Sequence, residues 1–324
     1  MTHQTTFAHA EFAAKQKTTR REKFLARMEE VIPWARLLAV IEPHYPKGQR
    51  GRPPIGLERM LRVYFLQQWY GLADEALEDA LYDSQALQRF ARLDLSAEGV
   101  PDATTLLNFR HLLETHDLCQ GLFTAINADL AARGLWLREG TLVDATLIAA
   151  PSSTKNARRE RDPEMHQTKQ GNQWYFGMKA HIGADRDSKL VHTGVGTAAN
   201  VADVTKTAEL LHGQETQVHA DAGDTGVDKR PEIVALPRKL AWQIAGKRGV
   251  IQALAEGAEK EALKAVEKTK ASVRAFVEHP FHIVKNLFRH RKVRYRGLAK
   301  NGHQLYTLFA LANAVLGART RATA

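Results

Sequence analysis

The sequence is poor in cysteine and has no long apolar run, and each absence excludes a class of protein. Among its 324 residues the only cysteine is Cys119, so one chain forms neither a disulfide framework nor a cysteine-rich zinc site. No stretch approaches the ~20 apolar residues that a membrane-spanning helix needs. Residues 1–17 are polar and lack the apolar core of a secretory signal. We therefore expect a cytoplasmic protein with no membrane partner.

Acidic residues and several common catalytic motifs are also in short supply. Lys and Arg number 46 against 36 Asp and Glu, a formal net charge of +10, which favours a polyanionic partner. Hydrophobic residues make up 44% and charged residues 25%, a composition that excludes wholesale disorder. The chain contains no GxxxxGK[ST] phosphate loop, no GxSxG elbow and no HExxH zinc pair.

The first half of the chain has helical periodicity. Residues 1–50 comprise a polar arm, a basic run, one helical segment and a proline-rich linker. From residue 57 to 140 the apolar residues recur at helical spacing, as Leu57, Leu61 and Phe65 illustrate, and Asp102 is placed to cap a helix. We predict an all-helical domain over residues 51–138.

The second half changes to a mixed pattern. We expect a helix over 203–211, a long exposed loop over 151–173, mostly helix over 251–320, and strands over 141–149, 174–182, 190–197, 216–221 and 240–245. This order predicts an α/β fold, a mixed sheet with flanking helices over residues 139–318, preceded by the helical domain.

Two aspartates lie in or next to apolar strands, where an unpaired carboxylate would destabilise the fold. Asp144 is in the middle of an apolar strand, and a buried carboxylate needs a cation or a hydrogen-bonding partner; its alternative role is to cap a neighbouring loop. Asp221 follows another short strand, and ligands of open α/β sheets gather at the carboxyl ends of strands. Asp224 is its rival, but turn residues of this kind are commonly exposed to solvent.

Glu278 completes a possible set of three carboxylates. At about 100° per residue, a regular helix places Arg274, Glu278 and Lys285 within ~40° of one face. Such a face is more often a surface salt-bridge stripe, and Pro280 would kink the helix. Three carboxylates nevertheless suit Mg²⁺, which prefers oxygen ligands. Two such ions ~4 Å apart bind and activate a phosphodiester.

Six short motifs occur in order along the chain: Gly51-Arg-Pro-Pro54, Pro101-Asp-Ala-Thr-Thr105, Leu142-Val-Asp-Ala-Thr-Leu147, Tyr175-Phe-Gly-Met-Lys-Ala-His181, Ala220-Asp-Ala-Gly223 and Val277-Glu-His-Pro-Phe281. With them the chain resembles, over residues 20–316, bacterial transposases of the insertion sequence 5 family, within the DDE superfamily with an RNase H-like core.

The resemblance implies catalytic, metal-ligating roles for Asp144, Asp221 and Glu278, with two Mg²⁺ ions per active site (Mn²⁺ as a substitute). It implies cleavage at the terminal inverted repeats of a mobile element and attack of the freed 3′-OH on target DNA. It further implies DNA contacts by Arg274 and Lys285, a homodimer, and a bacterial, nucleoid-associated location.

The chain departs from the family at two positions. The signature tyrosine is replaced by Ala271, and Asp224 stands where the family usually has tyrosine. An extra carboxylate near Asp221 could compete for the metal, so one alternative is a catalytically impaired, transposase-derived DNA-binding protein. A structure-specific nuclease on the same core is a third hypothesis, which the helical front domain disfavours.

A basic segment follows Glu278. Residues 285–300 are rich in Lys and Arg and contain no acid, which is typical of a phosphate track although most charge runs are simply solvated. We predict DNA contacts here, with Phe288 and Tyr295 as stacking surfaces; the predicted DNA-contacting cations are Lys285, Arg289, Arg291, Lys292, Arg294 and Arg296.

Other DNA contacts are weaker predictions. Lys179 and His181 are candidates, with edge-strand polarity as the alternative, and so are the loop cations Lys155, Arg158, Arg159 and Arg161. Arg50 and Arg52 form a small basic hook of the kind that enters an A·T-rich minor groove. The helical domain is expected to recognise the inverted repeats, with a helix-turn-helix around Gly71.

Overall fold

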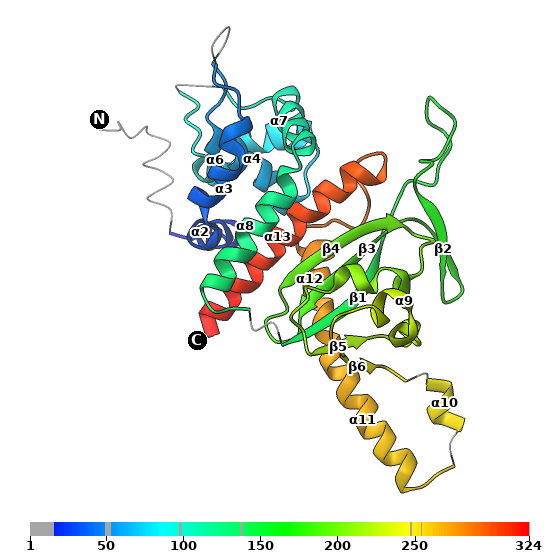
Figure 1. The fold of residues 1–324 in the computed structure, drawn as a ribbon. Coiled ribbons are helices and arrows are strands. Elements are labelled where there is room, and N and C mark those ends of the chain that lie inside the picture. Colours follow the sequence, from blue (N-terminus) through cyan, green and yellow to red (C-terminus); the bar gives the residue numbers. More distant parts are fainter. Residues whose placement is uncertain are drawn as a thin grey trace. The chain divides into compact units, whose positions relative to one another are not determined.

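Two compact units make up the chain, Met1–Leu118 and Cys119–Ala324 (Figure 1). The structure, a computed structural model, describes residues 16–48, 53–96, 99–136, 139–246, 248–253 and 255–323. Within these ranges no helix has the length and apolarity to cross a bilayer. The predicted boundary at residues 138/139 differs from this division, because helix α8 (Leu118–Ala132) belongs with the second unit.

The first unit is helical in its described residues, as the apolar spacing predicts. Its elements are α2 (Arg20–Val31), α3 (Trp34–Ile41), η1 (Glu42–His44), α4 (Leu57–Tyr70), α5 (Asp74–Asp83), α6 (Gln85–Ala91) and α7 (Ala103–Thr115). Thr19 and Glu22 form a capping box at the start of α2. Asp102 caps α7 as predicted, accepting a 2.7 Å hydrogen bond from the Thr105 N–H. Gly71, in the left-handed conformation at φ 62°, ends α4.

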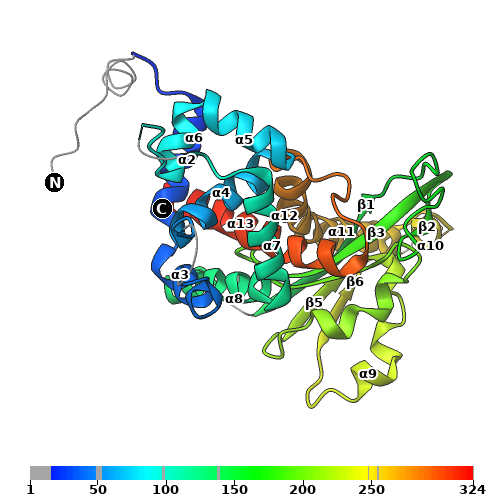
Figure 2. The same ribbon diagram turned by 90° about the horizontal axis from the view of Figure 1, so that it is seen from above.

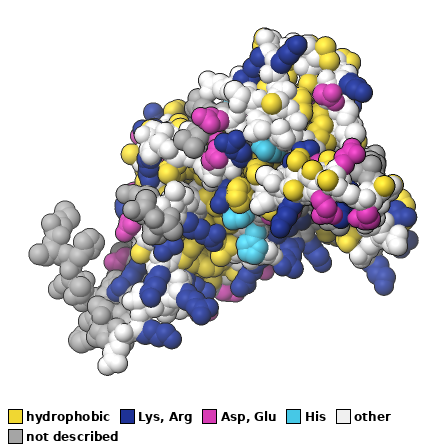
Figure 3. Space-filling model, turned by 90° about the horizontal axis from the view of Figure 1, so that it is seen from below, with side chains coloured by type: hydrophobic (Ala, Val, Ile, Leu, Met, Phe, Trp, Pro, Cys, Tyr) yellow, Lys and Arg dark blue, Asp and Glu magenta, His cyan; other side chains and the backbone are white. Residues whose placement is uncertain are grey.

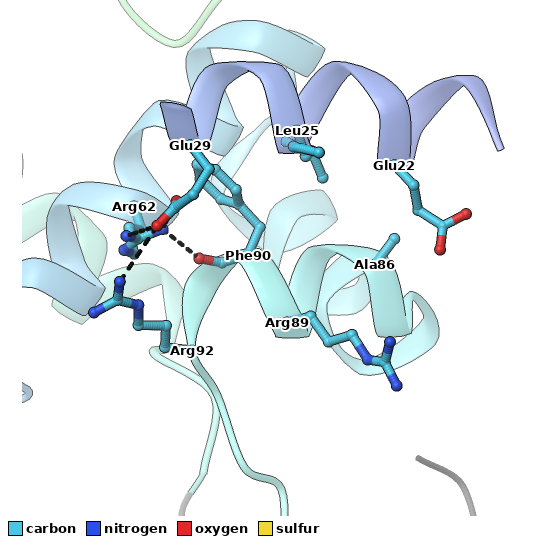
Figure 4. Close-up of a pocket in the computed structure, with 9 residues that line it drawn as sticks. Glu22, Leu25, Glu29, Arg62, Ala86, Arg89, Phe90 and Arg92 are labelled. Carbon is cyan, nitrogen blue, oxygen red and sulfur yellow. Dashed lines mark hydrogen bonds and ion pairs between the residues drawn. The ribbon is translucent and has the colours of Figure 1, made fainter. Parts of the chain in front are cut away.

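A paired charge lies inside this helical unit. The Arg62 side chain on α4 is only 1% exposed and forms ion pairs with Glu29 and Glu58. It also donates to the Phe90 carbonyl at 3.0 Å, and its guanidinium lies 4.0 Å from the Trp34 ring centroid. Figure 4 shows Arg62, Glu29 and Phe90 beside a pocket of about 250 Å³ between α2 and α6. The guanidinium is therefore satisfied by its neighbours and stabilises the packing of the helices.

A six-stranded mixed sheet forms the centre of the second unit. Its strands are β1 (Gly140–Ala149), β2 (His166–Gln170), β3 (Gln173–Asp185), β4 (Val191–Ala198), β5 (Gln217–Ala220) and β6 (Ala241–Ile244). The order is β2-β3-β1-β5-β6, with β4 also paired to β3. Strands β1, β5 and β6 are parallel to one another, and β3 is antiparallel to β1, β2 and β4. The predicted α/β fold with a mixed sheet is confirmed.

Helices flank this sheet. Helix α13 (Leu298–Thr323) packs on β4, where a Cβ at Gly194 would lie 3.0 Å from the Phe309 ring, so glycine permits the close approach. Buried Asn313 on α13 donates to Asn127 on α8 and to the Val191 carbonyl, each at 2.7 Å. Seen from above in Figure 2, α8 and α13 lie side by side. After β6 the chain forms α10 (Arg248–Ala253) and then α11 (Ala258–Arg274).

Two sequence predictions for this unit are wrong in part. The expected helix over 203–211 is a pair of short 3-10 helices, η2 (Asp203–Thr205) and η3 (Thr207–Leu210), because local side-chain bonds compete with a helix: the Thr205 hydroxyl donates to the Ala202 carbonyl at 2.6 Å. The expected loop over 151–173 contains β2, which is polar because it has no face in the core.

Candidate active site

Asp144 and Asp221 come together through the register of two parallel strands. Leu142 on β1 pairs with His219 on β5. Each aspartate lies two residues beyond its member of that pair, so the two carboxylates occupy neighbouring positions just past the end of the β1–β5 ladder. Asp221 begins the 3-10 turn η4 (Ala222–Asp224), and its carboxylate accepts a 2.5 Å hydrogen bond from the Gly223 N–H.

Glu278 comes from a helical segment that packs against β1. After α11 the chain continues as a 3-10 turn η6 (Ala275–Val277), the short helix α12 (Glu278–His282) and a π-helical turn η7 (Ile283–Leu287). Glu278 is exposed, whereas its neighbours Val277 and Phe281 are buried. The chain from Arg274 to Lys285 is not the regular helix that the one-face prediction requires, because it passes through 3-10, α- and π-helical turns. Glu278 nevertheless acts on the pKa of Lys285, and Arg274 and Glu278 both act on the pKa of Asp144.

The charges of Glu278 and Asp221 act on Asp144. Burial raises the pKa of Asp144 to about 7, and the like charges of Glu278 and Asp221 push the pKa in the same direction. Two groups oppose this shift: the Ala145 N–H, which donates to Asp144 Oδ1 at 2.7 Å, and the Arg274 guanidinium. The balance shows that the negative charge of Asp144 is only partly compensated.

The carboxylate cluster matches the chemistry of a divalent cation. A set of carboxylate oxygens with unrelieved mutual repulsion suits Mg²⁺ or Mn²⁺. In the described residues no three His, Cys, Asp or Glu side chains are close enough to hold one ion as they stand. Arg274 lies 3.9 Å from Asp221 Oδ2 and supplies the nearest positive charge. The donor set fits the metal, but the side chains must draw together to bind it.

Asp224 does not occupy the exposed position that the sequence suggests. Its side chain is 4% exposed and accepts a 3.3 Å hydrogen bond from the Thr207 hydroxyl. Burial, with Asp221 and Asp203 as negative neighbours, raises its pKa to about 6. Asp224 therefore anchors the η4 turn to η3 by a buried contact. No sequence pattern indicates this role for Thr207, because a threonine in a polar stretch has many possible roles.

Lys179 and His181 face the protein interior in this structure. The Lys179 side chain is 12% exposed, and its ammonium donates to Asp203 and to the Val201 carbonyl, each at 2.9 Å. His181 is fully buried against Thr197, 2.8 Å away, and burial lowers its pKa to about 4. The predicted DNA contact of His181 is wrong in this conformation, and so is the edge-strand alternative, because β3 pairs with strands on both sides.

The basic segment after Glu278 is folded onto the sheet. The Val293 N–H donates to the Ala149 carbonyl at 2.9 Å and the Ala149 N–H to the Arg291 carbonyl at 3.2 Å, which forms a parallel bridge beside the last residue of β1. Phe288 is fully buried, so its prediction as a stacking surface is wrong. It packs in the core because the π-helical turn ends there.

The cations of this segment have different surroundings. Lys285 is partly buried, which lowers its pKa, while Glu278 opposes that shift. Arg296 pairs with Glu160 at 2.5 Å, and Arg291 donates to Asn286 at 2.5 Å. Exposed side chains remain at Arg289, Arg291, Lys292 and Arg296, and Arg294 is partly exposed. Arg50 and Arg52 lie outside the described residues.

Two comparisons with protein families agree with this arrangement. Residues 12–112 match the family described as Transposase domain (DUF772), and residues 135–314 match the Transposase DDE domain. The second match contains Asp144, Asp221, Glu278 and the whole sheet. No solved structure matches the chain significantly. The chain thus belongs to the DDE transposase family.

Proposed function

We propose that this protein is a DNA transposase of the insertion sequence 5 type, which cleaves at the terminal inverted repeats of its element and joins the 3′-OH ends to target DNA. The observation that carries the proposal is the convergence of Asp144, Asp221 and Glu278 from two strands and a helical segment, with Asp221 and Glu278 close enough to raise the pKa of Asp144. The match to the Transposase DDE domain supports the same conclusion.

Asp144, Asp221 and Glu278 would hold two Mg²⁺ ions, for which Mn²⁺ could substitute. When bound, such ions activate an attacking oxygen and stabilise a leaving oxygen at a phosphodiester. The protein contributes the position of each carboxylate: β1 and β5 fix the two aspartates, and the packing of Val277 and Phe281 fixes Glu278. The Arg274 guanidinium, 3.9 Å from Asp221, is placed to move from the carboxylate to a DNA phosphate.

The surface charge suits double-stranded DNA as the partner. On the face shown in Figure 3, Lys and Arg side chains are more widespread than Asp and Glu, consistent with the net charge of +10. Lys285, Arg289, Arg291, Lys292, Arg294 and Arg296 follow the catalytic glutamate in the chain and form the proposed phosphate track. Pairing of two element ends would require a homodimer.

The test is a supercoiled plasmid carrying the element's ends, incubated with the full-length protein and Mg²⁺. We expect cleavage confined to those ends in the wild type and none with Asp144→Asn. Asp187→Asn is the matched control, because Asp187 is paired with Arg186 on an exposed turn. Wild-type nicking at arbitrary positions, binding without cleavage, or full activity of Asp144→Asn would each contradict the proposal.

A further inference from the structure

Strands β2 and β3 form a two-stranded ribbon that the proposed function does not use. Residues 166–170 pair with 173–177 through a two-residue turn, in which Gly171 takes a φ of +59°. Strand β2 lies at the edge of the sheet (Figure 1). Most side chains of the ribbon are exposed, including the amides of Gln167, Gln170, Asn172 and Gln173.

One face of the ribbon combines aromatic rings with cations. Trp174 pairs with Lys169 and Phe176 pairs with Gln167, so these four side chains share a face. Trp174 is 63% exposed, although it is among the largest apolar side chains of the chain. The Arg161 guanidinium lies 5.4 Å from the Phe176 ring centroid and adds a second cation to this face.

Negative charge is held away from this face. Residues 166–176 contain no Asp or Glu. The acids of the preceding loop are engaged elsewhere: Glu160 pairs with Arg296, Asp162 accepts from the Gly297 N–H, and Glu164 accepts from the Leu298 N–H. Lys169 has no ion pair with any residue that the structure describes. The face therefore presents uncompensated positive charge beside an exposed indole.

Duplex DNA is the partner that matches this combination. The major groove is about 12 Å wide and admits a two-stranded β-ribbon. Amide side chains pair with adenine edges, apolar groups contact thymine methyls, and cations outside the groove neutralise phosphates. A protein ligand would need acids opposite Lys169 and Arg161, and it would give no particular role to the Gln167 amide on the same face.

We propose that the β2–β3 ribbon enters the major groove of double-stranded DNA, with Lys169 and Arg161 on phosphates and Trp174 against base edges. The inference rests on the proposed function only in taking DNA as the substrate. Binding measured in EDTA separates the two, because cleavage at element ends can succeed or fail independently of the ribbon.

The test uses the full-length protein, a fluorescent mixed-sequence duplex, and one strand of that duplex as a second probe. Lys169→Gln should weaken duplex binding about eightfold at 0.1 M salt and lower the slope of log K against log salt by about 0.9. Its control is Lys264→Gln, since the Lys264 charge is already paired with Glu261 at 2.6 Å. The control should leave both quantities unchanged.

The Trp174 indole is uncharged, so its contribution to DNA binding should not depend on the release of counterions. Trp174→Ala should weaken duplex binding roughly tenfold, equivalent to about 1.4 kcal/mol, with no change in salt slope. Trp174→Phe should retain most of the affinity. Val234→Ala, which shortens an apolar side chain that is 68% exposed on α9 (Pro231–Val234), is the control and should have no effect.

Three results would overturn the proposal. The first is duplex binding by Trp174→Ala and Lys169→Gln equal to that of their controls. The second is a loss confined to the single strand, which would indicate base stacking instead of groove entry. The third is dissociation of a DNA-free oligomer by Trp174→Ala, which would make the ribbon an interface between copies of the chain.

Discussion

Arg62 in the helical unit and Asp144 in the sheet unit both place charge away from water, but their surroundings differ. Arg62 contacts two carboxylates and a carbonyl, and its hydrogen bond to Glu29 holds the pKa of Glu29 below its usual range. Asp144 has one N–H donor and the Arg274 charge, and two like charges act against them, so its charge is only partly compensated. A compensated buried charge marks packing, whereas an uncompensated one marks a place where a ligand is expected.

The largest expected effect comes from neutralising a carboxylate of the cluster. Asp221→Asn should reduce end cleavage more than about 100-fold, beyond what the loss of an outer-shell partner costs a metal site. Asp224→Asn should reduce it less than about tenfold, because an amide oxygen still accepts from Thr207. The rates of end cleavage by Asp221→Asn and Asp224→Asn are compared on the same plasmid. Equal losses would mean that Asp224 is itself a metal ligand.

At Arg62 we expect a loss of stability, in contrast to the loss of cleavage expected at the carboxylates. Arg62→Met should remove the buried one of the two cations that Glu29 and Glu58 share, leaving them only the exposed Arg92. It should lower the free energy of unfolding by about 3 kcal/mol, the low end for a broken buried pair, because both acids are partly exposed and keep Arg92. Urea unfolding of the purified protein measures it. Arg36→Met, at an exposed position on α3, should change stability little. If Arg62→Met were as stable as the wild type, Arg62 would not stabilise the packing of the helices, and its contrast with Asp144 would not hold.

The pH dependence sharpens the comparison. Because the pKa of Asp144 is raised to about 7, the folded metal-free protein binds a proton that the unfolded chain releases near pH 4. Its stability should therefore fall as pH rises from about 4 through 7, with Asp224 adding the same trend. Thermal unfolding in EDTA should show a shallower fall for Asp144→Asn. Superimposable pH profiles would show that Asp144 is not perturbed.

The smallest effect concerns the anchor of the η4 turn. Thr207→Val should cost about 1 kcal/mol, the typical net contribution of one hydrogen bond, and more if the Asp224 carboxylate is left without a donor. Thr205→Val is the matched control, since its hydroxyl reaches only the local Ala202 carbonyl. Equal unfolding midpoints for the two variants would argue against the anchor.

The fold was largely predictable because it depends on local patterns. Periodic apolar residues located the helices of the first unit, and short β-branched runs located β1, β3, β4, β5 and β6. Strand β2 was not predicted, because an edge strand with both faces exposed to solvent has no alternation of apolar and polar residues. Its signal was the Gly171-Asn172 pair, a common hairpin turn.

The site was predictable in its members more than in its surroundings. Asp144 and Asp221 stood out because a carboxylate in or directly after an apolar strand demands an explanation. The burial of Phe288 and His181 could not be predicted from composition. Both lie near basic residues in the sequence, which suggests exposure, and only tertiary packing places them in the interior. The bond between Thr207 and Asp224 joins segments 17 residues apart, a contact that no local pattern encodes.

The most direct test of the central claim is divalent metal binding by the full-length protein without DNA, measured by titration with Mn²⁺ and electron paramagnetic resonance. The account predicts saturable binding that Asp144→Asn, Asp221→Asn and Glu278→Gln each weaken, while Asp187→Asn binds as the wild type does. Wild-type affinity in all three variants would show that these carboxylates do not share a metal site and would contradict the account.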